Sequence, residues 1–122
     1  MPWAFKENRP IFQQIYDMIV IRILNGTYPK GGKLPSVREM AEEAGVNPNT
    51  MQRAMSQLED TGLAITNRTS GRVVTTDEEL LKKIRREYAA AAAEEFLQEM
   101  KKLGTVIECV ILGKIFSEKE AR

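Results

Sequence analysis

Apolar residues recur every three or four positions over residues 10–25, and this spacing predicts a first helix. Pro10 suits a first helical position, because a helix leaves that N–H without a partner. Residues 27–33 contain a proline and two glycines and are expected to form a linker. The apolar stripe of the helix consists of Ile11, Ile15, Met18, Ile19 and Ile23.

Two shorter amphipathic segments follow, residues 36–44 and residues 47–60. The first opens with Ser36 and Glu39, a pair typical of a capping box, in which each side chain satisfies a free backbone N–H. The second opens with Asn47, a favoured N-cap, followed by a proline. The pattern therefore predicts two helices that are separated by a very short turn.

Residues 63–66 and 72–75 form short β-type runs around a turn-like segment, which favours a hairpin. Apolar residues then resume helical spacing over residues 77–103 and again over residues 105–115. Helices joined by a short turn and followed by a small hairpin are typical of a winged helix-turn-helix.

The expected fold class is mainly α with a small β-hairpin, a winged helix-turn-helix plus a C-terminal two-helix element. The expected domains are a DNA-binding domain over residues 9–76 and a dimerisation or effector tail over residues 77–122.

Composition excludes several kinds of chemistry. The 122 residues include no histidine and one cysteine, Cys109. The chain therefore lacks the histidine base of the common nucleophilic triads and the ligands of most zinc sites. We expect no enzymatic activity, no metal and no cofactor. No segment has the length of a membrane span and no secretory signal is visible, so a cytoplasmic protein is expected. The formal net charge of +1 means that any attraction to nucleic acid must come from a local patch.

The segment 47–60 is the candidate recognition helix. With Met51, Ala54, Met55 and Leu58 facing the core, its N-terminal polar side chains face outward and include no carboxylate. Gln52 could read adenine, and Arg53 could read guanine or hold a phosphate. A solvated polar face of an ordinary amphipathic helix remains the alternative. The outward residues are Asn49, Thr50, Gln52, Arg53, Ser56 and Gln57.

Basic side chains outside this helix have two interpretations each. Arg38 could contact DNA, with Ser36 near the phosphates, or could pair with Glu42 one helical turn later. The hairpin turn holds Arg68, Thr69, Ser70, Gly71 and Arg72, which suit phosphate or minor-groove contact but could equally form a solubilising turn.

The stretch from Pro10 to Val74 resembles the N-terminal domain of the GntR family of bacterial transcription regulators. Three motifs carry the resemblance. The run GGKLPSVRE at residues 31–39 is close to a family signature, NPNTMQRA at residues 47–54 resembles the start of the recognition helix, and LEDTGL at residues 58–63 resembles the lead into the wing.

The resemblance implies a dimeric repressor or activator that binds double-stranded DNA at a pseudo-palindromic operator. It maps DNA contacts to Arg38, Asn49, Thr50, Gln52 and the wing near Gly71. The wing departs from the family pattern Gly-x-Gly-Thr-Phe-Val, since residues 69–74 read TSGRVV. Including the residues proposed from patterning, the candidate DNA-binding set is Ser36, Arg38, Asn47, Asn49, Thr50, Gln52, Arg53, Ser70, Gly71 and Arg72.

The short C-terminal tail resembles the YtrA subfamily, which is often linked to transporter genes. Two helices cannot enclose a metabolite within one subunit, but they can bury an apolar stripe against a second copy. A homodimer without membrane partners is therefore expected, and any small-molecule effector is unknown. A small-molecule sensor with its ligand at the dimer interface, or a protein-interaction module, remains the alternative. The expected dimerisation residues are Leu81, Ile84, Tyr88, Ala92, Phe96, Met100, Ile107 and Ile111.

Overall fold

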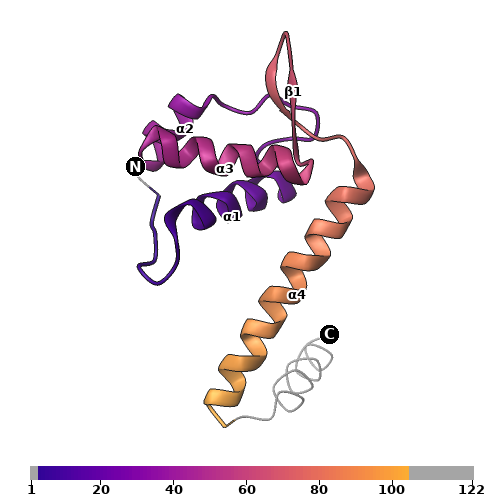
Figure 1. The fold of residues 1–122 in the computed structure, drawn as a ribbon. Coiled ribbons are helices and arrows are strands. Elements are labelled where there is room, and N and C mark those ends of the chain that lie inside the picture. The colour runs from indigo at the N-terminus through magenta and orange to yellow at the C-terminus, as the bar shows by residue number, and fades with distance from the viewer. Residues whose placement is uncertain (1–2, 105–122) are drawn as a thin grey trace, which may run out of the picture. The chain divides into compact units, whose positions relative to one another are not determined.

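A computed structural model describes residues 3–104 of the chain (Figure 1). Within that range the order of elements is the predicted one, mainly α with an antiparallel hairpin, so the fold class is confirmed. The predicted helix at residues 105–115 lies outside the described residues. The elements are α1 (Ile11–Leu24), α2 (Val37–Ala44), α3 (Pro48–Thr61), β1 (Ala64–Asn67), β2 (Gly71–Val74) and α4 (Glu78–Lys102).

The helix boundaries follow from local hydrogen bonds. The Ser36 hydroxyl accepts from the Glu39 amide at 3.1 Å, and the Ser36 amide donates to the Glu39 carboxylate at 3.3 Å, which completes the predicted capping box. Helix α2 ends at Gly45, whose φ of 73° lies in the left-handed region that favours glycine. Two residues later the Asn47 side chain accepts from the Asn49 amide at 2.7 Å and opens α3.

Helix α3 is the central element of the domain, because α1, α2 and β1 all pack against it (Figure 1). Its predicted inward residues are fully buried, as the helical spacing requires. Their neighbours in the core come from the inward faces of α1 and α2. The core of these helices contains Ile15, Ile19, Val20, Met40, Met51, Ala54, Met55 and Leu58.

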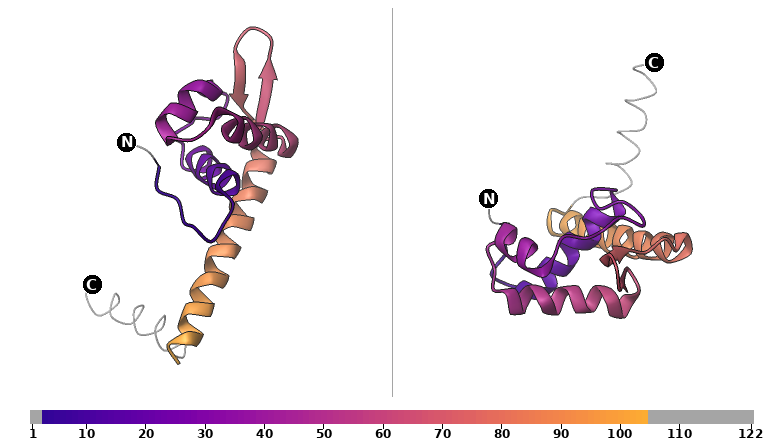
Figure 2. Two further views of the ribbon diagram at one scale, coloured as in Figure 1. Left: turned by 60° about the vertical axis from the view of Figure 1, so that its left-hand side comes forward. Right: turned by 90° about the horizontal axis from the view of Figure 1, so that it is seen from above.

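The hairpin projects beyond these helices (Figure 2). Ala64 pairs with Val74 and Asn67 pairs with Gly71, so the strands are in register along their whole length. Leu63 and Val74, at the base of the hairpin, are buried, whereas the side chains toward the turn are largely exposed. The core therefore anchors one end of the hairpin and leaves the other end in solvent.

The N-terminal segment packs along the helices. The Trp3 amide donates to the carbonyl of Ala44 at 3.1 Å, and its indole N–H donates to the Glu43 carboxylate at 2.9 Å. The buried Gln14 side chain holds the same segment through the Lys6 amide and carbonyl, both at 2.7 Å. Residues 3–9 are thus fixed to both α1 and the end of α2.

The chain divides into two units after Lys82, a few residues into α4. Leu81 and Ile84, near the start of α4, are buried, and from Ala89 onward most side chains of this helix are exposed. No helix within residues 3–104 is long and apolar enough to cross a membrane.

Candidate nucleic-acid interface

The N-terminal half of α3 presents an exposed polar surface. Asn49, Gln52 and Arg53 are exposed and Thr50 is half-buried, while the opposite face of the helix is buried in the core. The first turn of α3 contains no acidic residue. The positive end of its dipole therefore lies at this surface without a competing carboxylate in that turn.

Neighbouring side chains orient two of the candidate base-reading residues. The Gln52 amide donates to the Ser56 hydroxyl at 3.0 Å, one helical turn further on. The Arg53 guanidinium lies 3.7 Å from the centre of the Phe12 ring, a cation–π contact between α3 and α1. Arg53 also lines an open depression together with Asn49, Thr50 and the first residues of α1. The spacing of residues along the chain did not show this contact between Arg53 and α1. It holds the Arg53 side chain on the same side of α3 as Asn49 and Thr50.

Arg38 lies in the first turn of α2 and is exposed. The alternative partner, Glu42, does not form an ion pair with it among the residues that the structure describes. Ser36, by contrast, is engaged in the capping box and contributes an ordered helix start beside Arg38.

The turn of the hairpin is ordered by one side chain. The Asn67 carboxamide oxygen accepts from the amide of Thr69 at 2.9 Å and from its hydroxyl at 2.8 Å. Gly71 has a φ of 77°, a conformation that is strained for a residue with a side chain. Arg68 is exposed at the turn, and Ser70 is half-buried.

Arg72 differs from the other candidate cations, because it is paired inside the domain. Its guanidinium forms an ion pair with Glu59 of α3, whose same oxygen accepts the Thr66 hydroxyl at 2.9 Å. The hydrogen bonds from Arg72 and Thr66 lower the pKa of the Glu59 carboxyl, and they outweigh partial burial, which acts in the opposite direction. Glu59 therefore links α3 to both strands of the hairpin.

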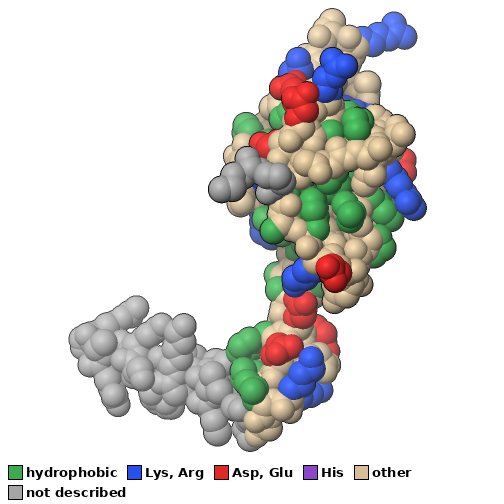
Figure 3. Space-filling model, turned by 90° about the vertical axis from the view of Figure 1, so that its left-hand side faces the viewer, with side chains coloured by type: hydrophobic (Ala, Val, Ile, Leu, Met, Phe, Trp, Pro, Cys, Tyr) green, Lys and Arg blue, Asp and Glu red, His purple; other side chains and the backbone are tan. Residues whose placement is uncertain are grey.

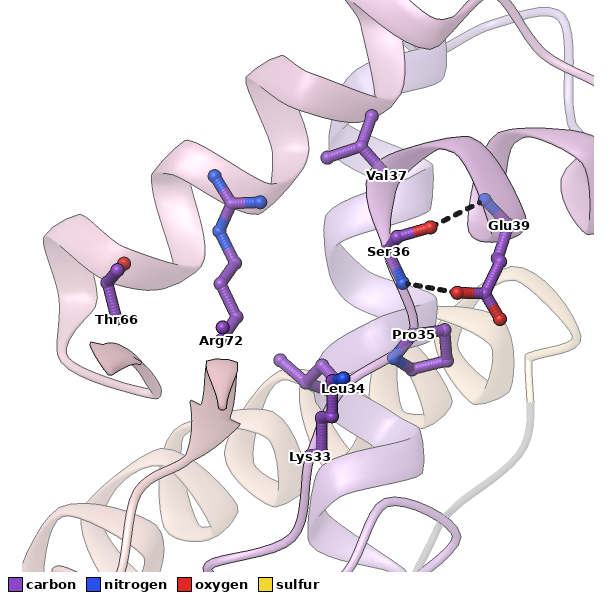
Figure 4. A pocket seen from close by; sticks show the side chains of 9 residues that line it. Lys33, Leu34, Pro35, Ser36, Val37, Glu39, Thr66 and Arg72 are labelled. Atoms are coloured by element: carbon purple, nitrogen blue, oxygen red, sulfur yellow. Dashed lines mark hydrogen bonds between the residues drawn. The ribbon is translucent and has the colours of Figure 1, made fainter. Parts of the chain in front are cut away.

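A cleft of about 460 Å³ separates the start of α2 from the hairpin (Figure 4). Ser36 and Glu39 line one side, Thr66 and Arg72 the other, and the two hydrogen bonds of the capping box stand at its edge. Lys and Arg side chains are visible around the hairpin (Figure 3). The cleft also includes Lys33, a cation that the sequence reading did not single out as a site residue.

The expected dimerisation stripe divides into two parts. Leu81 and Ile84 are buried in the single chain, and Tyr88 and Met100 are half-buried. Ala92 is exposed, and so is Phe96, at 45%. Ile107 and Ile111 lie outside the described residues.

Comparison with known proteins adds independent evidence. The family model for bacterial regulatory proteins of the gntR family matches residues 11–74. The uncharacterized HTH-type transcriptional regulator YhcF of Bacillus subtilis (strain 168) is 37% identical over 115 residues, which are 93% of this chain and 95% of YhcF. The HTH-type transcriptional repressor YtrA of the same organism is 37% identical over 70 residues, which are 57% of this chain and 54% of YtrA.

A solved structure shows the same similarity. A GntR family transcriptional regulator from Listeria monocytogenes matches with a TM-score of 0.78 and 40% sequence identity, covering 88% of this chain and 95% of that one. With YhcF and the Listeria protein, the similarity extends over most of the chain and beyond the hairpin.

Proposed function

The chain belongs to the GntR family of DNA-binding transcriptional regulators, and we propose that it acts as a homodimeric repressor on a pseudo-palindromic operator. Its relatives and its fold are those of regulators and not of enzymes. The observation that supports the proposal most directly is the acid-free, exposed first turn of α3, whose Pro48 lines one depression with the exposed Arg38 of α2.

In this proposal the N-terminal end of α3 enters the major groove. Asn49, Thr50 and Gln52 meet base edges or adjacent phosphates, and Arg38 contacts the backbone next to them. The hairpin turn near Gly71 approaches the flanking backbone or minor groove, where the lack of a side chain permits a close approach. A two-fold axis between subunits sets the spacing of the half-sites.

The exposed apolar residues of α4 support dimerisation. Phe96 is 45% exposed and Leu97 37%, on a helix of 25 residues, and Leu103, directly after the helix, is 70% exposed. A second copy of the chain would remove these side chains from water, which is favourable in proportion to the apolar area buried. Repression is the expected direction because YtrA of Bacillus subtilis is a named repressor, and the resemblance to its subfamily makes transporter genes the expected targets.

The test is a fluorescence-anisotropy titration of labelled duplex DNA from the region upstream of the gene, with a scrambled duplex alongside. The wild type is expected to prefer the upstream duplex, and Arg38→Ala is expected to lose most of that binding. Arg86→Ala, an exposed arginine of α4, serves as the matched control and should bind like the wild type. Equal, salt-insensitive binding of both duplexes, or full binding by Arg38→Ala, would refute the proposal.

Dimerisation is tested separately by sedimentation equilibrium. The wild type is expected to sediment at twice the chain mass, and Phe96→Asp is expected to shift the equilibrium toward the monomer. Glu95→Gln, at the neighbouring exposed position, provides the control and should remain dimeric. A monomeric wild type at micromolar concentration would contradict this part of the proposal.

A further inference from the structure

The segment that precedes α2 pairs with β2 of the hairpin through an isolated β-bridge. The Leu34 amide donates to the Arg72 carbonyl at 2.9 Å, the Val74 amide donates to the Gly32 carbonyl at 2.9 Å, and Lys33 forms a bridge with Val73. Leu34 is buried, at 2% exposure, so its position along the chain is tied to the core. Lys33 is consequently held beside the hairpin although it lies 40 residues from Val73 in the chain.

The side chain of Lys33 runs past Gly71. A Cβ atom added at Gly71 would lie 4.0 Å from the Cε atom of Lys33, in ordinary contact. Lys33 is exposed, lines the cleft between α2 and the hairpin, and takes part in no ion pair within residues 3–104. A lysine ammonium on a flexible stem is a suitable point charge for a phosphate oxygen.

Arg72, the obvious cation at this position, is already engaged. Its side chain is 22% exposed and pairs with a Glu59 side chain that is 34% exposed. Turning Arg72 toward DNA would leave the Glu59 carboxylate partly buried without its cation, and separating such a pair is unfavourable. The same oxygen also holds Thr66, so the movement would disturb both strands of the hairpin.

We propose that Lys33 supplies a phosphate contact beside the hairpin, next to Gly71, and that Arg72 acts through Glu59 to position the hairpin. The inference rests on the proposed function, since it assumes that this face meets DNA. Lys33 is a binding residue outside the candidate DNA-binding set, and Arg72, a member of that set, becomes a positioning residue.

The Glu39 carboxylate also lines the cleft and adds a negative charge to it. Glu39 accepts a hydrogen bond from the Ser36 amide at 3.3 Å, which keeps this carboxylate at the start of α2. Its negative charge reduces the net attraction of the cleft for phosphate. A Glu39→Gln substitution should therefore strengthen DNA binding or leave it unchanged while Lys33 stays in place.

The experiment measures the salt dependence of DNA binding for the full chain. Affinity falls with salt concentration raised to a power of about 0.9 for each phosphate that a protein neutralises. Lys33→Gln removes one phosphate contact from each subunit of the proposed dimer, so it should lower the slope of log affinity against log salt by about 1.8, and affinity at 0.1 M salt by about 60-fold. Because a phosphate carries no sequence information, the loss should be the same for the upstream and scrambled duplexes.

Lys30→Gln is the matched control. Lys30 is three residues away in the same loop and forms an ion pair with Glu78 at the start of α4. This variant should keep the wild-type slope. An unchanged slope in Lys33→Gln, or an equal loss in Lys30→Gln, would overturn the inference while wild-type binding continued to support the proposed function. A wild type that binds neither duplex at low salt would refute the proposed function itself, and the inference with it.

The role of Arg72 is tested with a charge-neutral pair. Arg72→Gln alone should lower thermal stability, because it leaves Glu59 without its cation. The double variant Arg72→Gln with Glu59→Gln should recover part of that stability and keep the wild-type salt slope. A slope lower by about 1.8 in the double variant, two contacts per dimer, would show that Arg72 contacts phosphate directly and would refute the positioning role.

Discussion

Replacing Trp3 with alanine is expected to lower the free energy of unfolding by about 3 kcal/mol. The Trp3 side chain is 8% exposed, and the guanidinium of Arg22 lies 4.5 Å from its ring centre. Removal of a buried tryptophan ring costs about 3–5 kcal/mol in protein cores. We expect the lower value of this range for Trp3→Ala. The N-terminal segment can detach while the helices stay folded, so the loss of stability cannot exceed the free energy with which this segment docks.

Trp3→Phe removes the hydrogen bond and keeps a six-membered aromatic ring. The indole N–H donates to Glu43 at 2.9 Å, and that carboxylate is about half exposed, so water can replace the lost donor. The expected cost is therefore at least about 1 kcal/mol, the ordinary contribution of one hydrogen bond, and lies below that of Trp3→Ala, because phenylalanine loses only the five-membered ring. Ile21→Ala is the matched control, since Ile21 is 50% exposed on the same helix as Arg22 and should change stability by less than about 1 kcal/mol.

The assay is urea unfolding followed by far-UV circular dichroism. All variants are compared at one protein concentration, because dimerisation would couple stability to concentration. The signal does not depend on Trp3, the sole tryptophan of the chain, so the wild type and the variants are read in the same way. A loss below about 0.5 kcal/mol for Trp3→Ala would show that the N-terminal segment is not docked in solution, and would refute the reasoning.

Three further outcomes follow from the described contacts. Leu58→Ala, at a fully buried position of α3, should cost about 2–5 kcal/mol in the same urea assay, and a loss under 1 kcal/mol would contradict the assigned core. Ser36→Ala removes the α2 cap and should cost about 1 kcal/mol, whereas Ser36→Thr should retain most of it. Hydrogen bonds from arginine hold the pKa of the Glu43 and Glu59 carboxyls below the ordinary value, so their stabilisation is present at neutral pH and is lost as the pH falls below about 4.5. Thermal melts from pH 7 to pH 3 should show this decline, and a Glu43→Gln variant with the same acid sensitivity as the wild type would argue against it.

Local features of the fold were predictable from neighbouring residues. The capping box of Ser36 and Glu39 spans three positions, and the buried face of α3 repeats at helical spacing. Both depend on backbone geometry that is the same in every α-helix, so a single sequence is enough to recognise them. The resemblance of the run that begins at Gly31 to the GntR signature predicted the family and a DNA-binding face.

Long-range pairings could not be predicted in the same way. Arg72 and Glu59 are 13 positions apart, and Trp3 and Glu43 are 40 apart. Both arginine and glutamate are common on solvated surfaces, so their presence alone does not indicate a partner. The candidate role of Arg72 changed because the structure placed Glu59 within reach of it.

The order of helices and strands, their caps and the polar face of α3 follow from the amino-acid sequence alone, because these features depend on contacts within a few residues. Which charged side chains are paired and which are exposed depends on the folded domain. Packing of α1, α3 and the hairpin brings Phe12 to Arg53 and Glu59 to Arg72, and it leaves Lys33 exposed beside Gly71. Such pairings arise from burial of the shared core, and no spacing along the chain specifies them.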